Sequence, residues 1–259
     1  MHWIKNTEHL KAGKYIYFAS DFHLGAPNHQ ESLEREKRLV EWLNTIKPTA
    51  EALFLVGDIF DFWFEYKRAV PRGFTRFLGK ISEFTDEGIP VHFFIGNHDM
   101  WIFDYLPKET GMIIHKGPYE VQWNEKKFFI AHGDGLGPGD WSYKFLRSIF
   151  RNPFSQWLFE RIHPNLGIWI ARKWSHSSRI TNGEPDEFRG EDKEMLVQFS
   201  KKVLQNQHFD YFLYGHRHTP IDFRLNSNSR YINLGDWIKH STYAYFDGKE
   251  VYLEHFTRE

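Results

Sequence analysis

The chain has 259 residues, of which 41% are hydrophobic, and its formal net charge is −1. This length is enough for one large α/β domain or two small ones. The chain contains no cysteine, which excludes disulfides, thiolate metal sites and cysteine nucleophiles. No long apolar run follows the charged N-terminal residues, which predicts neither a signal peptide nor a membrane-spanning helix. We therefore expect a cytoplasmic protein that is either soluble or bound peripherally to a membrane.

The charge is unevenly distributed along the chain. Residues 141–180 contain seven Lys or Arg and a single acidic residue, Glu160, so this segment carries +6 and the remainder carries −7. A basic segment on an acidic protein favours an anionic partner, although a solvated helix face with scattered charges is the ordinary alternative. Bulky apolar residues lie between the basic ones, unlike the broad basic surface that duplex binding favours. We therefore expect no nucleic-acid partner and favour a phosphate-bearing substrate or an anionic lipid.

The first half of the chain alternates predicted strands and helices. Three short apolar, β-rich runs predict strands, and the two stretches between them have the apolar spacing of amphipathic helices. The order strand, helix, strand predicts βαβ units and hence a parallel sheet. The strands are expected at residues 14–20, 52–57 and 90–96, and the helices at residues 32–47 and 73–87.

The second half begins with a predicted hairpin, whose two strands are separated by the turn Asn124-Glu125. Three short helices, separated by Asn-Pro and His-Pro-Asn breaks, then precede a longer helix, a strand and a strand-rich C-terminal part. The hairpin strands are expected at residues 119–123 and 126–131, the helices at residues 141–151, 154–162, 166–174 and about 190–205, and the later strands at residues 209–214, 221–225, 230–234, 241–246 and 250–256.

Five polar clusters each follow one of the predicted strands. In open α/β sheets, ligands bind outside the carboxyl ends of the strands. Carboxylate, imidazole and amide groups are ligands for divalent metals, and the imidazoles favour manganese, iron or zinc over calcium. The clusters are Asp-Phe-His at residues 21–23, Gly-Asp at 57–58, Gly-Asn-His-Asp at 96–99, His-Gly-Asp at 132–134 and Gly-His-Arg-His at 215–218.

The spacing within these clusters supports a shared site. Asp21 and His23 are separated by one residue, as are His216 and His218, so on an extended chain each pair points the same way. Asp58 follows a glycine, which permits a close approach of backbone and carboxylate. Each residue alone has an ordinary explanation as a turn or surface side chain. The ordered set of five clusters is what predicts a site for a pair of metals.

The ordered series of clusters resembles the calcineurin-like metallophosphoesterase superfamily over nearly the whole chain. The resemblance implies an α/β fold, a four-layer α/β/β/α sandwich, with two divalent metal ions at the strand ends and manganese as the expected metal. It implies a single domain over residues 1–259 with a helical cap inserted at about residues 136–190. By motif match, one metal would be bound by Asp21, His23, Asp58 and His218, and the other by Asp58, Asn97, His132 and His216.

Two further residues are expected to take part in catalysis. His98 follows the expected ligand Asn97, so its ring should reach the substrate phosphate as a donor or general acid. Asp99 is expected to orient His98 by accepting its second N–H, with a turn-stabilising role as the equal alternative. In such sites two metals stabilise charge on the phosphoryl oxygens and lower the pKa of the attacking water.

The region after the His-Gly-Asp cluster resembles the cap of the UDP-2,3-diacylglucosamine hydrolase family, at residues 132–147 and 171–182. The resemblance implies a step of lipid A biosynthesis, hydrolysis of a nucleotide-linked glycolipid to UMP and 2,3-diacylglucosamine 1-phosphate, at the inner-membrane surface that the basic aromatic cap would contact. Members of that family carry Arg where this chain has His98. The implied substrate contacts are Asn97, His98, Asp140, Tyr143, Ser178, Asn182 and His216.

Two other functions are compatible with the residues. The first is a phosphodiesterase or pyrophosphatase that acts on another nucleotide conjugate or another lipid diphosphate, since the superfamily includes several such activities. The second is a non-catalytic metal-binding scaffold of the same fold. All seven expected ligand positions carry residues able to bind a metal, which favours an enzyme over a scaffold.

Overall fold

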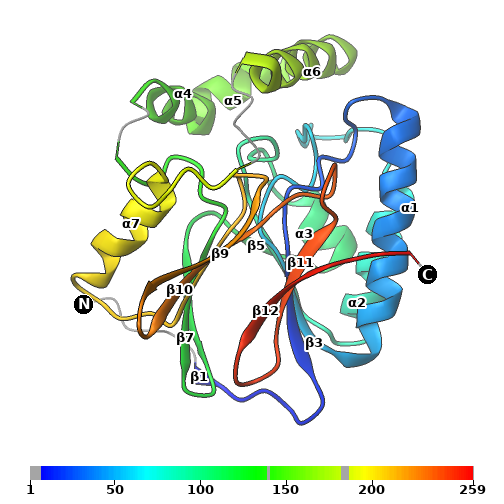
Figure 1. Ribbon diagram of the computed structural model, residues 1–259. Coiled ribbons are helices and arrows are strands. Elements are labelled where there is room, and N and C mark those ends of the chain that lie inside the picture. Colours follow the sequence, from blue (N-terminus) through cyan, green and yellow to red (C-terminus); the bar gives the residue numbers. More distant parts are fainter. Residues whose placement is uncertain (1–6, 139–140, 182–186, 259) are drawn as a thin grey trace.

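Two six-stranded β-sheets lie face to face at the centre of the molecule (Figure 1). The computed structural model describes residues 7–138, 141–181 and 187–258. The first sheet has the order β12-β11-β2-β3-β4-β5, and the second has the order β1-β6-β7-β8-β10-β9. The strands of the first are β2 (Tyr15–Ala19), β3 (Ala50–Leu55), β4 (Val91–Phe94), β5 (Ile113–His115), β11 (Thr242–Phe246) and β12 (Val251–His255). Those of the second are β1 (Thr7–Glu8), β6 (Tyr119–Trp123), β7 (Lys126–Ala131), β8 (Tyr211–Tyr214), β9 (Pro220–Asn226) and β10 (Ser229–Leu234).

The strand directions place several carboxyl ends at one end of the sandwich. Strands β2, β3 and β4 run parallel, as predicted from the strand–helix alternation. Strand β5, which was not predicted, continues the parallel order, and β7 is parallel to β8 in the second sheet. Strands β6 and β7 form the predicted hairpin, in which Trp123 pairs with Lys126 across the two-residue turn. Loops that follow β2, β3, β4, β7 and β8 therefore meet above the sandwich.

Helices cover the outer face of each sheet, which confirms the four-layer α/β/β/α arrangement. Helices α1 (His29–Ile46), α2 (Thr75–Asp86) and α3 (Tyr105–Thr110) pack on the first sheet, where Trp42 and Phe77 are fully buried. Helix α7 (Met195–Leu204) packs on the second sheet through Val197. Phe54 and Phe128 belong to the apolar layer between the sheets.

Helices α1 and α2 are joined by a buried side chain. The N-terminus of α1 has an ordinary cap, because the side chain of Asn28 accepts a hydrogen bond from the backbone N–H of Glu31 at 3.0 Å. The N-terminus of α2 lacks such a local cap and uses Glu36 of α1 instead. Glu36 Oε1 accepts from the backbone N–H groups of Arg76 and Phe77 at 2.9 and 3.1 Å. Helix α1 ends at Ile46 and is followed by a 3₁₀ turn (Lys47–Thr49) that contains Pro48.

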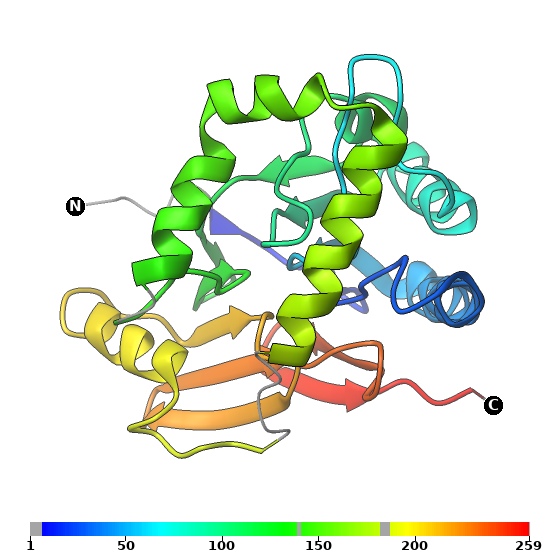
Figure 2. The same ribbon diagram turned by 90° about the horizontal axis from the view of Figure 1, so that it is seen from above.

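Three helices lie beyond the carboxyl ends of the strands (Figure 1): α4 (Trp141–Arg151), α5 (Pro153–Glu160) and α6 (Pro164–Thr181). Seen from above, they run along successive sides of a frame around the strand-end loops (Figure 2). Their inner side packs on those loops through Phe159 of α5. The centre of its ring lies 4.9 Å from that of Trp101 and 4.8 Å from that of Phe64. Within the described residues, none of the helices is long and apolar enough to cross a membrane.

Helix α3 was not predicted, and α6 and α7 differ most from their predicted ranges. Helix α6 extends to Thr181, seven residues beyond the expected end at residue 174, because no Gly or Pro interrupts that stretch. Helix α7 starts at Met195 instead of about residue 190. The preceding turn contains Glu194, whose carboxylate pairs with the guanidinium of Arg217 at 3.2 Å. Both side chains are buried. This tertiary contact replaces the first helical turn that the periodicity predicted.

Candidate metal and active site

The loops after five strands bring the predicted ligands together from both sheets. Asp21 and His23 follow β2, Asp58 follows β3, and Asn97 follows β4 in the first sheet. From the second sheet, His132 follows β7, and His216 and His218 follow β8. Among the described residues, three groups of His and Asp side chains could hold a metal ion. Two of them consist of predicted ligands, and the third, His23 with Asp61 and His98, shares His23 with the first.

The first group consists of Asp21, His23 and His218. The Nε2 atoms of the two imidazoles lie 3.2 Å apart. Asp21 Oδ1 lies 3.3 Å from His218 Nε2 and 3.7 Å from His23 Nε2. Three potential donor atoms therefore converge on one small space.

The second group consists of Asp58, Asn97, His132 and His216. His132 Nε2 lies 3.3 Å from Asp58 Oδ2 and 3.2 Å from Asn97 Oδ1. Asn97 Oδ1 also lies 3.0 Å from His216 Nδ1. Asp58 Oδ2 is 3.8 Å from His23 Nε2 of the first group, so this carboxylate lies between the two groups.

The backbone at these loops is left-handed instead of extended. Asp21, His23, Asp58, His216 and His218 all have φ between 44° and 67°, a region that non-glycine residues seldom adopt and that costs of order 1 kcal/mol or more per residue. We expected the paired ligands to converge because side chains alternate along an extended chain. The ligands do converge, but this reason is wrong. They converge because sharp turns follow the strands.

Glycines allow the turns to approach one another. A Cβ atom at Gly57 would collide with the ring of His132, and one at Gly96 would collide with the carboxylate and backbone nitrogen of Asp58. Both neighbours belong to the second ligand group. The Gly-Asp and Gly-Asn pattern of the sequence thus reflects a close packing of loops around the site.

Each buried carboxylate has one oxygen fixed by a backbone N–H and one facing the other ligands. Asp58 Oδ1 accepts from the N–H of His98 at 2.9 Å, and Asp21 Oδ2 accepts from the N–H of His216 at 3.0 Å. Asp21 Oδ1 is buried and has no hydrogen-bond partner among the described residues. A buried carboxylate oxygen left without a donor is costly, and a bound cation would satisfy it.

Hydrogen bonds behind the ligands orient the imidazoles. His132 Nδ1 donates to the carbonyl oxygen of Val56 at 2.9 Å, which leaves Nε2 unprotonated toward the second group in the neutral ring. On the other side, His218 Nδ1 lies 3.5 Å from Asp236 Oδ2. Burial acts to raise the pKa of Asp236, but bonds from His218 and two backbone N–H groups outweigh it and lower that pKa to about 2. The Asp236 carboxylate is therefore charged at neutral pH.

The buried charges of the site require a cation. Burial acts to raise the pKa of Asp58, but the imidazoles of His132, His98 and His23 outweigh it and hold that pKa well below its usual range. Burial acts to lower the pKa of His23, but Asp21, Asp61 and Asp58 raise it to about 9. Protons on the imidazoles thus take the place that a metal would occupy, and metal binding would release them.

The donor set fits two divalent ions. Carboxylate, amide and imidazole groups are present together, and the donor atoms of each group lie close to one another. Within the part of the chain that the structure describes, the buried Asp21 Oδ1 has no hydrogen-bond partner. Mixed nitrogen and oxygen donors of this kind suit divalent transition metals.

The carboxylate that faces His98 is Asp61, which the sequence analysis did not single out. His98 Nδ1 donates to the backbone carbonyl of Asp61 at 3.0 Å, and the Asp61 carboxylate lies 3.8 Å from the same nitrogen and 3.6 Å from His23 Nδ1. His98 Nε2 then faces the cluster, 4.0 Å from Asp58 Oδ2. A second acidic residue three positions after Asp58 was the available signal.

Asp99 does not fulfil the expected role of orienting His98. It is fully buried, and its two oxygens accept from the backbone N–H groups of Ile59, Phe60 and Gly96 at 2.7 to 3.3 Å. Burial and the nearby Asp58 raise its pKa to about 7 despite these bonds. Asp99 therefore holds two ligand-bearing loops together, which corresponds to the turn-stabilising alternative.

Only some of the predicted substrate contacts lie among the described residues. Asn97, His98 and His216 lie at the cluster described above. Asp140 and Asn182 lie outside the described residues, as do the side chains of Tyr143 and Ser178, whose backbone belongs to α4 and α6.

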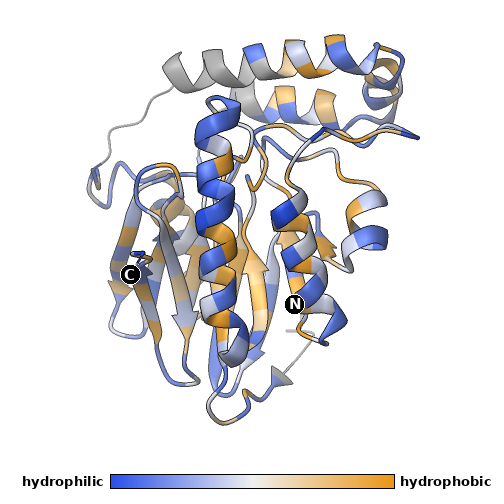
Figure 3. Ribbon diagram, turned by 90° about the vertical axis from the view of Figure 1, so that its right-hand side faces the viewer, coloured by the Kyte–Doolittle hydropathy of each residue, from blue (hydrophilic) through white to orange (hydrophobic). Residues whose placement is uncertain are grey.

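Many apolar side chains of α4 to α6 remain exposed. Trp141 is 80% exposed, Phe145 68% and Phe154 65%. Basic side chains lie over neighbouring rings, with Arg161 4.6 Å from the centre of Trp157. Apolar and polar segments alternate along these upper helices (Figure 3).

Comparison with known proteins agrees with the geometry of the site. The family profile described as calcineurin-like phosphoesterase matches residues 14–220. The chain is 39% identical to a UDP-2,3-diacylglucosamine hydrolase of Porphyromonas gingivalis, over 92% of this chain and 96% of the relative, and 29% identical to one of Vibrio parahaemolyticus, over 85% and 89%. Among solved structures, the phosphoesterase Yfce of E. coli matches with a TM-score of 0.45 and 15% identity, over 92% of this chain and 90% of that one. The strand-end cluster thus belongs to a hydrolase of the calcineurin-like phosphoesterase family.

Proposed function

We propose that this protein hydrolyses the pyrophosphate bond of UDP-2,3-diacylglucosamine, giving UMP and 2,3-diacylglucosamine 1-phosphate. The observation that carries the proposal is the 39% identity to a relative of that name over nearly the full length of both chains. The chain also carries the helices α4 to α6, whose apolar and basic surface suits a phosphorylated lipid.

The residues at the strand ends would divide the work of this reaction. Asp21, His23, Asp58 and His218 would hold one divalent ion, and Asp58, Asn97, His132 and His216 the other, with manganese as the proposed metal. Such ions, when bound, supply positive charge to the phosphoryl oxygens and lower the pKa of a nearby water.

His98 is the proposed proton donor or hydrogen-bond donor to the reacting phosphate, and it would act in its imidazolium form, because Nδ1 donates to the carbonyl of Asp61 and the neutral ring would leave Nε2 unprotonated. Its Nδ1 is held by the carbonyl of Asp61, so its Nε2 points toward the ligand cluster. Asp61 is the positioning residue for His98, because its carboxylate and carbonyl both face the ring. An imidazole in this place can pass a proton to the departing oxygen, which the guanidinium of an Arg would not readily do.

We further propose that residues 1–259 form one domain in which about residues 136–190 are a cap that contacts both the acyl chains and the inner-membrane surface. Exposed aromatic side chains and a nearly complete lack of acidic residues on α4 to α6 support this, since anionic lipids attract such a surface. The reaction would then take place on the cytoplasmic face of that membrane.

The first test is a comparison of three substrates. Manganese-loaded protein would be incubated with UDP-2,3-diacylglucosamine, with its deacylated form and with bis(p-nitrophenyl) phosphate, and release of UMP or nitrophenol would be followed. Fast UMP release from the acylated substrate is expected, with much slower turnover of the other two. Hydrolysis of the aryl diester alone would reject the proposed substrate and favour another phosphodiesterase activity.

Membrane contact is tested by flotation with vesicles of phosphatidylglycerol and phosphatidylethanolamine. Wild-type protein should float with these vesicles at low salt and less with neutral ones, and Trp141→Ser with Phe145→Ser should reduce flotation. Tyr252→Ser is the matched control, because Tyr252 is an exposed aromatic residue of β12, away from α4 to α6. Equal flotation of all three proteins would contradict the proposed contact.

A further inference from the structure

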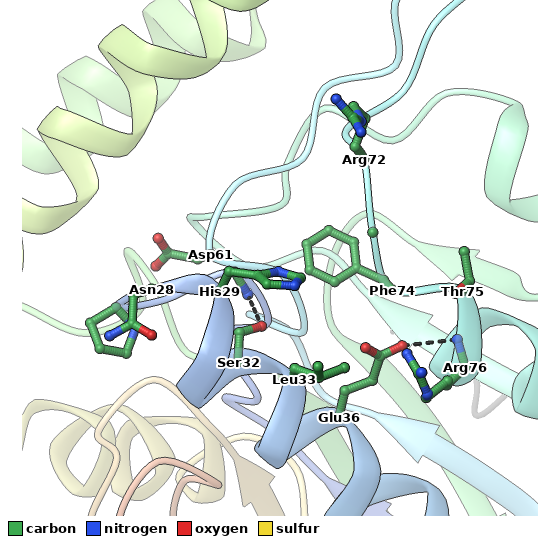
Figure 4. A pocket seen from close by; sticks show the side chains of 13 residues that line it. Asn28, His29, Ser32, Leu33, Glu36, Asp61, Arg72, Phe74, Thr75 and Arg76 are labelled. Carbon is green, nitrogen blue, oxygen red and sulfur yellow. Dashed lines mark hydrogen bonds between the residues drawn. The ribbon is translucent and has the colours of Figure 1, made fainter.

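A cavity of about 320 Å³ lies between the N-terminal ends of α1 and α2 (Figure 4). Its wall includes Gly25 and Asp61. Asp61 is the residue whose carboxylate contacts His23 and His98, and Gly25 is two residues beyond His23. The cavity is therefore directly beside the place where the phosphoryl group would react.

A second cavity continues this space toward the upper helices. It has a volume of about 720 Å³ and shares His29, Arg72 and Gly73 with the first. Its far wall is formed by α6, through residues that include Trp169 and Lys173. The two cavities together are large enough for a ligand of several hundred Å³, the usual size of a nucleotide-binding site.

One wall of the first cavity is aromatic and has an unusual backbone. Phe74 has φ of 61°, a left-handed conformation that is rare for a bulky side chain. Its ring packs against Phe60 at 5.1 Å and borders the cavity, with the ring of His29 beside the same space (Figure 4). Strained backbone of this kind is concentrated at functional sites, and flat rings at a cavity wall can stack on a nucleobase.

The rim carries cationic side chains that are not engaged elsewhere. Within the described part of the chain, the side chains of Arg72 and Arg76 take part in no ion pair or side-chain hydrogen bond, and both are exposed at the cavity. His29 is exposed there as well. Such groups can donate to the phosphate or carbonyl oxygens of a nucleotide.

The floor offers a buried acceptor. Glu36 is 4% exposed, and its Oε1 is occupied by the two N–H groups at the start of α2. Its second oxygen receives no hydrogen bond from the described residues, and the side chain borders the cavity (Figure 4). A carboxylate oxygen in this position can accept from a sugar hydroxyl, as acidic residues do at ribose sites.

We propose that this cavity binds the nucleoside half of the substrate, so that the base stacks on Phe74, the ribose meets Glu36 and Arg72 contacts the pyrimidine oxygens. The inference rests on the proposed function, which supplies a substrate with one nucleoside end and one lipid end. The lipid end would leave the reaction centre toward the apolar side chains of α4 and α5, and the nucleoside end toward α1 and α2. The reacting diphosphate lies between them.

The test measures binding of UMP and inorganic phosphate by calorimetry, with manganese-loaded and with metal-free protein. UMP should bind at least about tenfold more tightly than phosphate, and Arg72→Ala and His29→Ala should each remove about threefold to tenfold of UMP affinity while leaving phosphate affinity unchanged. Arg68→Ala is the matched control, because Arg68 is an exposed residue of the same loop that does not border either cavity. Its UMP affinity should equal that of the wild type.

Two results would overturn the assignment of the cavity. One is a wild-type protein that binds UMP no more tightly than phosphate, and the other is wild-type UMP affinity in both Arg72→Ala and His29→Ala. Failure of the proposed function is seen separately, as a lack of UMP release from UDP-2,3-diacylglucosamine by the wild type. If the wild type hydrolyses the lipid and both variants keep its UMP affinity, the proposed function stands and the assignment of the cavity to the nucleoside is rejected.

Discussion

The imidazole rings of His23 and His218 face each other with their Nε2 atoms 3.2 Å apart, although 195 residues separate them in the chain. Two nitrogen atoms at this distance need a proton or a cation between them, and the buried Asp21 Oδ1 beside them has no hydrogen-bond donor in the described ranges of the chain. This relationship links stability of the fold to occupancy of the site, because it brings together the ends of β2 and β8 from different sheets.

Removal of metal should therefore destabilise the protein. A ligand that binds only the native state adds about 2.7 kcal/mol of stability at a concentration of 100 times its Kd. We expect protein treated with EDTA to unfold several degrees lower than manganese-loaded protein in a thermal scan, with recovery when Mn²⁺ is restored. An unchanged Tm at saturating metal would contradict binding at this cluster.

Asp58 is the carboxylate between the two ligand groups, so its loss should affect both. We expect Asp58→Asn to retain less than half of the bound metal, measured by atomic emission, and to lose more than about 100-fold of its turnover. The far-ultraviolet circular dichroism should be unchanged, because the amide can still accept from the N–H of His98. Near-normal activity in this variant would refute the two-metal assignment.

Asp61 should act through His98 and His23 without binding the substrate phosphate itself. We expect Asp61→Asn to lower kcat by about 10- to 100-fold and to shift the pH dependence of kcat, because the charge beside His98 is removed. Asp99→Asn is the informative comparison, since Asp99 contacts only backbone N–H groups. Asp99→Asn should unfold at a lower urea concentration than the wild type. If Asp61→Asn and the wild type have the same pH dependence of kcat, Asp61 has no part in the proposed mechanism.

The exposed rings of α5 provide a test of lipid recognition. We expect Phe154→Ser with Trp157→Ser to reduce turnover of UDP-2,3-diacylglucosamine by at least about tenfold. The acyl chains would bury these exposed rings, and burial of a large apolar side chain contributes about 1.5–3 kcal/mol to binding. Turnover of bis(p-nitrophenyl) phosphate, which has no acyl chain, should stay within twofold of the wild type. Equal losses on both substrates would show that the rings support the fold and not the acyl chains.

A second pair of histidines should make the fold sensitive to acid at a distance from the strand-end site. His92 Nδ1 and His115 Nε2 lie 2.8 Å apart on β4 and β5, which requires a neutral ring on at least one side. Burial lowers the pKa of each from the ordinary 6.5 to about 4, with the charge of His115 also acting on His92. Between pH 6.5 and pH 4 the unfolded chain therefore binds more protons than the native one, and stability falls as pH falls through this window.

We expect a loss of about 1–3 kcal/mol in the free energy of unfolding between pH 7 and pH 4.5, from urea titrations. This range allows for the partial exposure of both rings. His92→Phe with His115→Phe should flatten this dependence, because Phe can stack on Phe54 as His92 does and carries no proton. A double variant that keeps the wild-type slope would place the acid sensitivity elsewhere.

The strands that precede the polar clusters, and the meeting of the candidate ligands at one end of the sheets, were largely predictable from the sequence, whereas β1, β5 and α3 were not. Apolar runs such as Ala50–Leu55 are short enough to be strands, and each is followed by a polar cluster. The hairpin at Asn124 was predictable because two β-rich runs flank a two-residue turn. Local composition carries this information directly.

The remaining features depend on contacts between distant parts of the chain. The pairing of Arg217 with Glu194 shortens α7, and Glu36 replaces a local cap of α2; neither leaves a pattern in the nearby residues. Asp61 and Asp99 are similar acidic residues in similar loops, and only their neighbours in space decide which one faces His98. The left-handed backbone of the ligands was also hidden, because Asp and His are not residues that mark such turns reliably.

Helices α4 to α6 are attached to the sheets at two neighbouring strands, which makes this segment easy to exchange for another. Ala131, the last residue of β7, pairs with Tyr214, the last residue of β8, so the chain leaves the sheet for α4 to α6 and returns to the neighbouring strand. A segment attached at two adjacent points can be exchanged for another of different length or polarity without altering strand register. If α4 to α6 bind the acyl chains as proposed, grafting these helices from a relative onto the sheets should change lipid preference while leaving the residues at the strand ends in place.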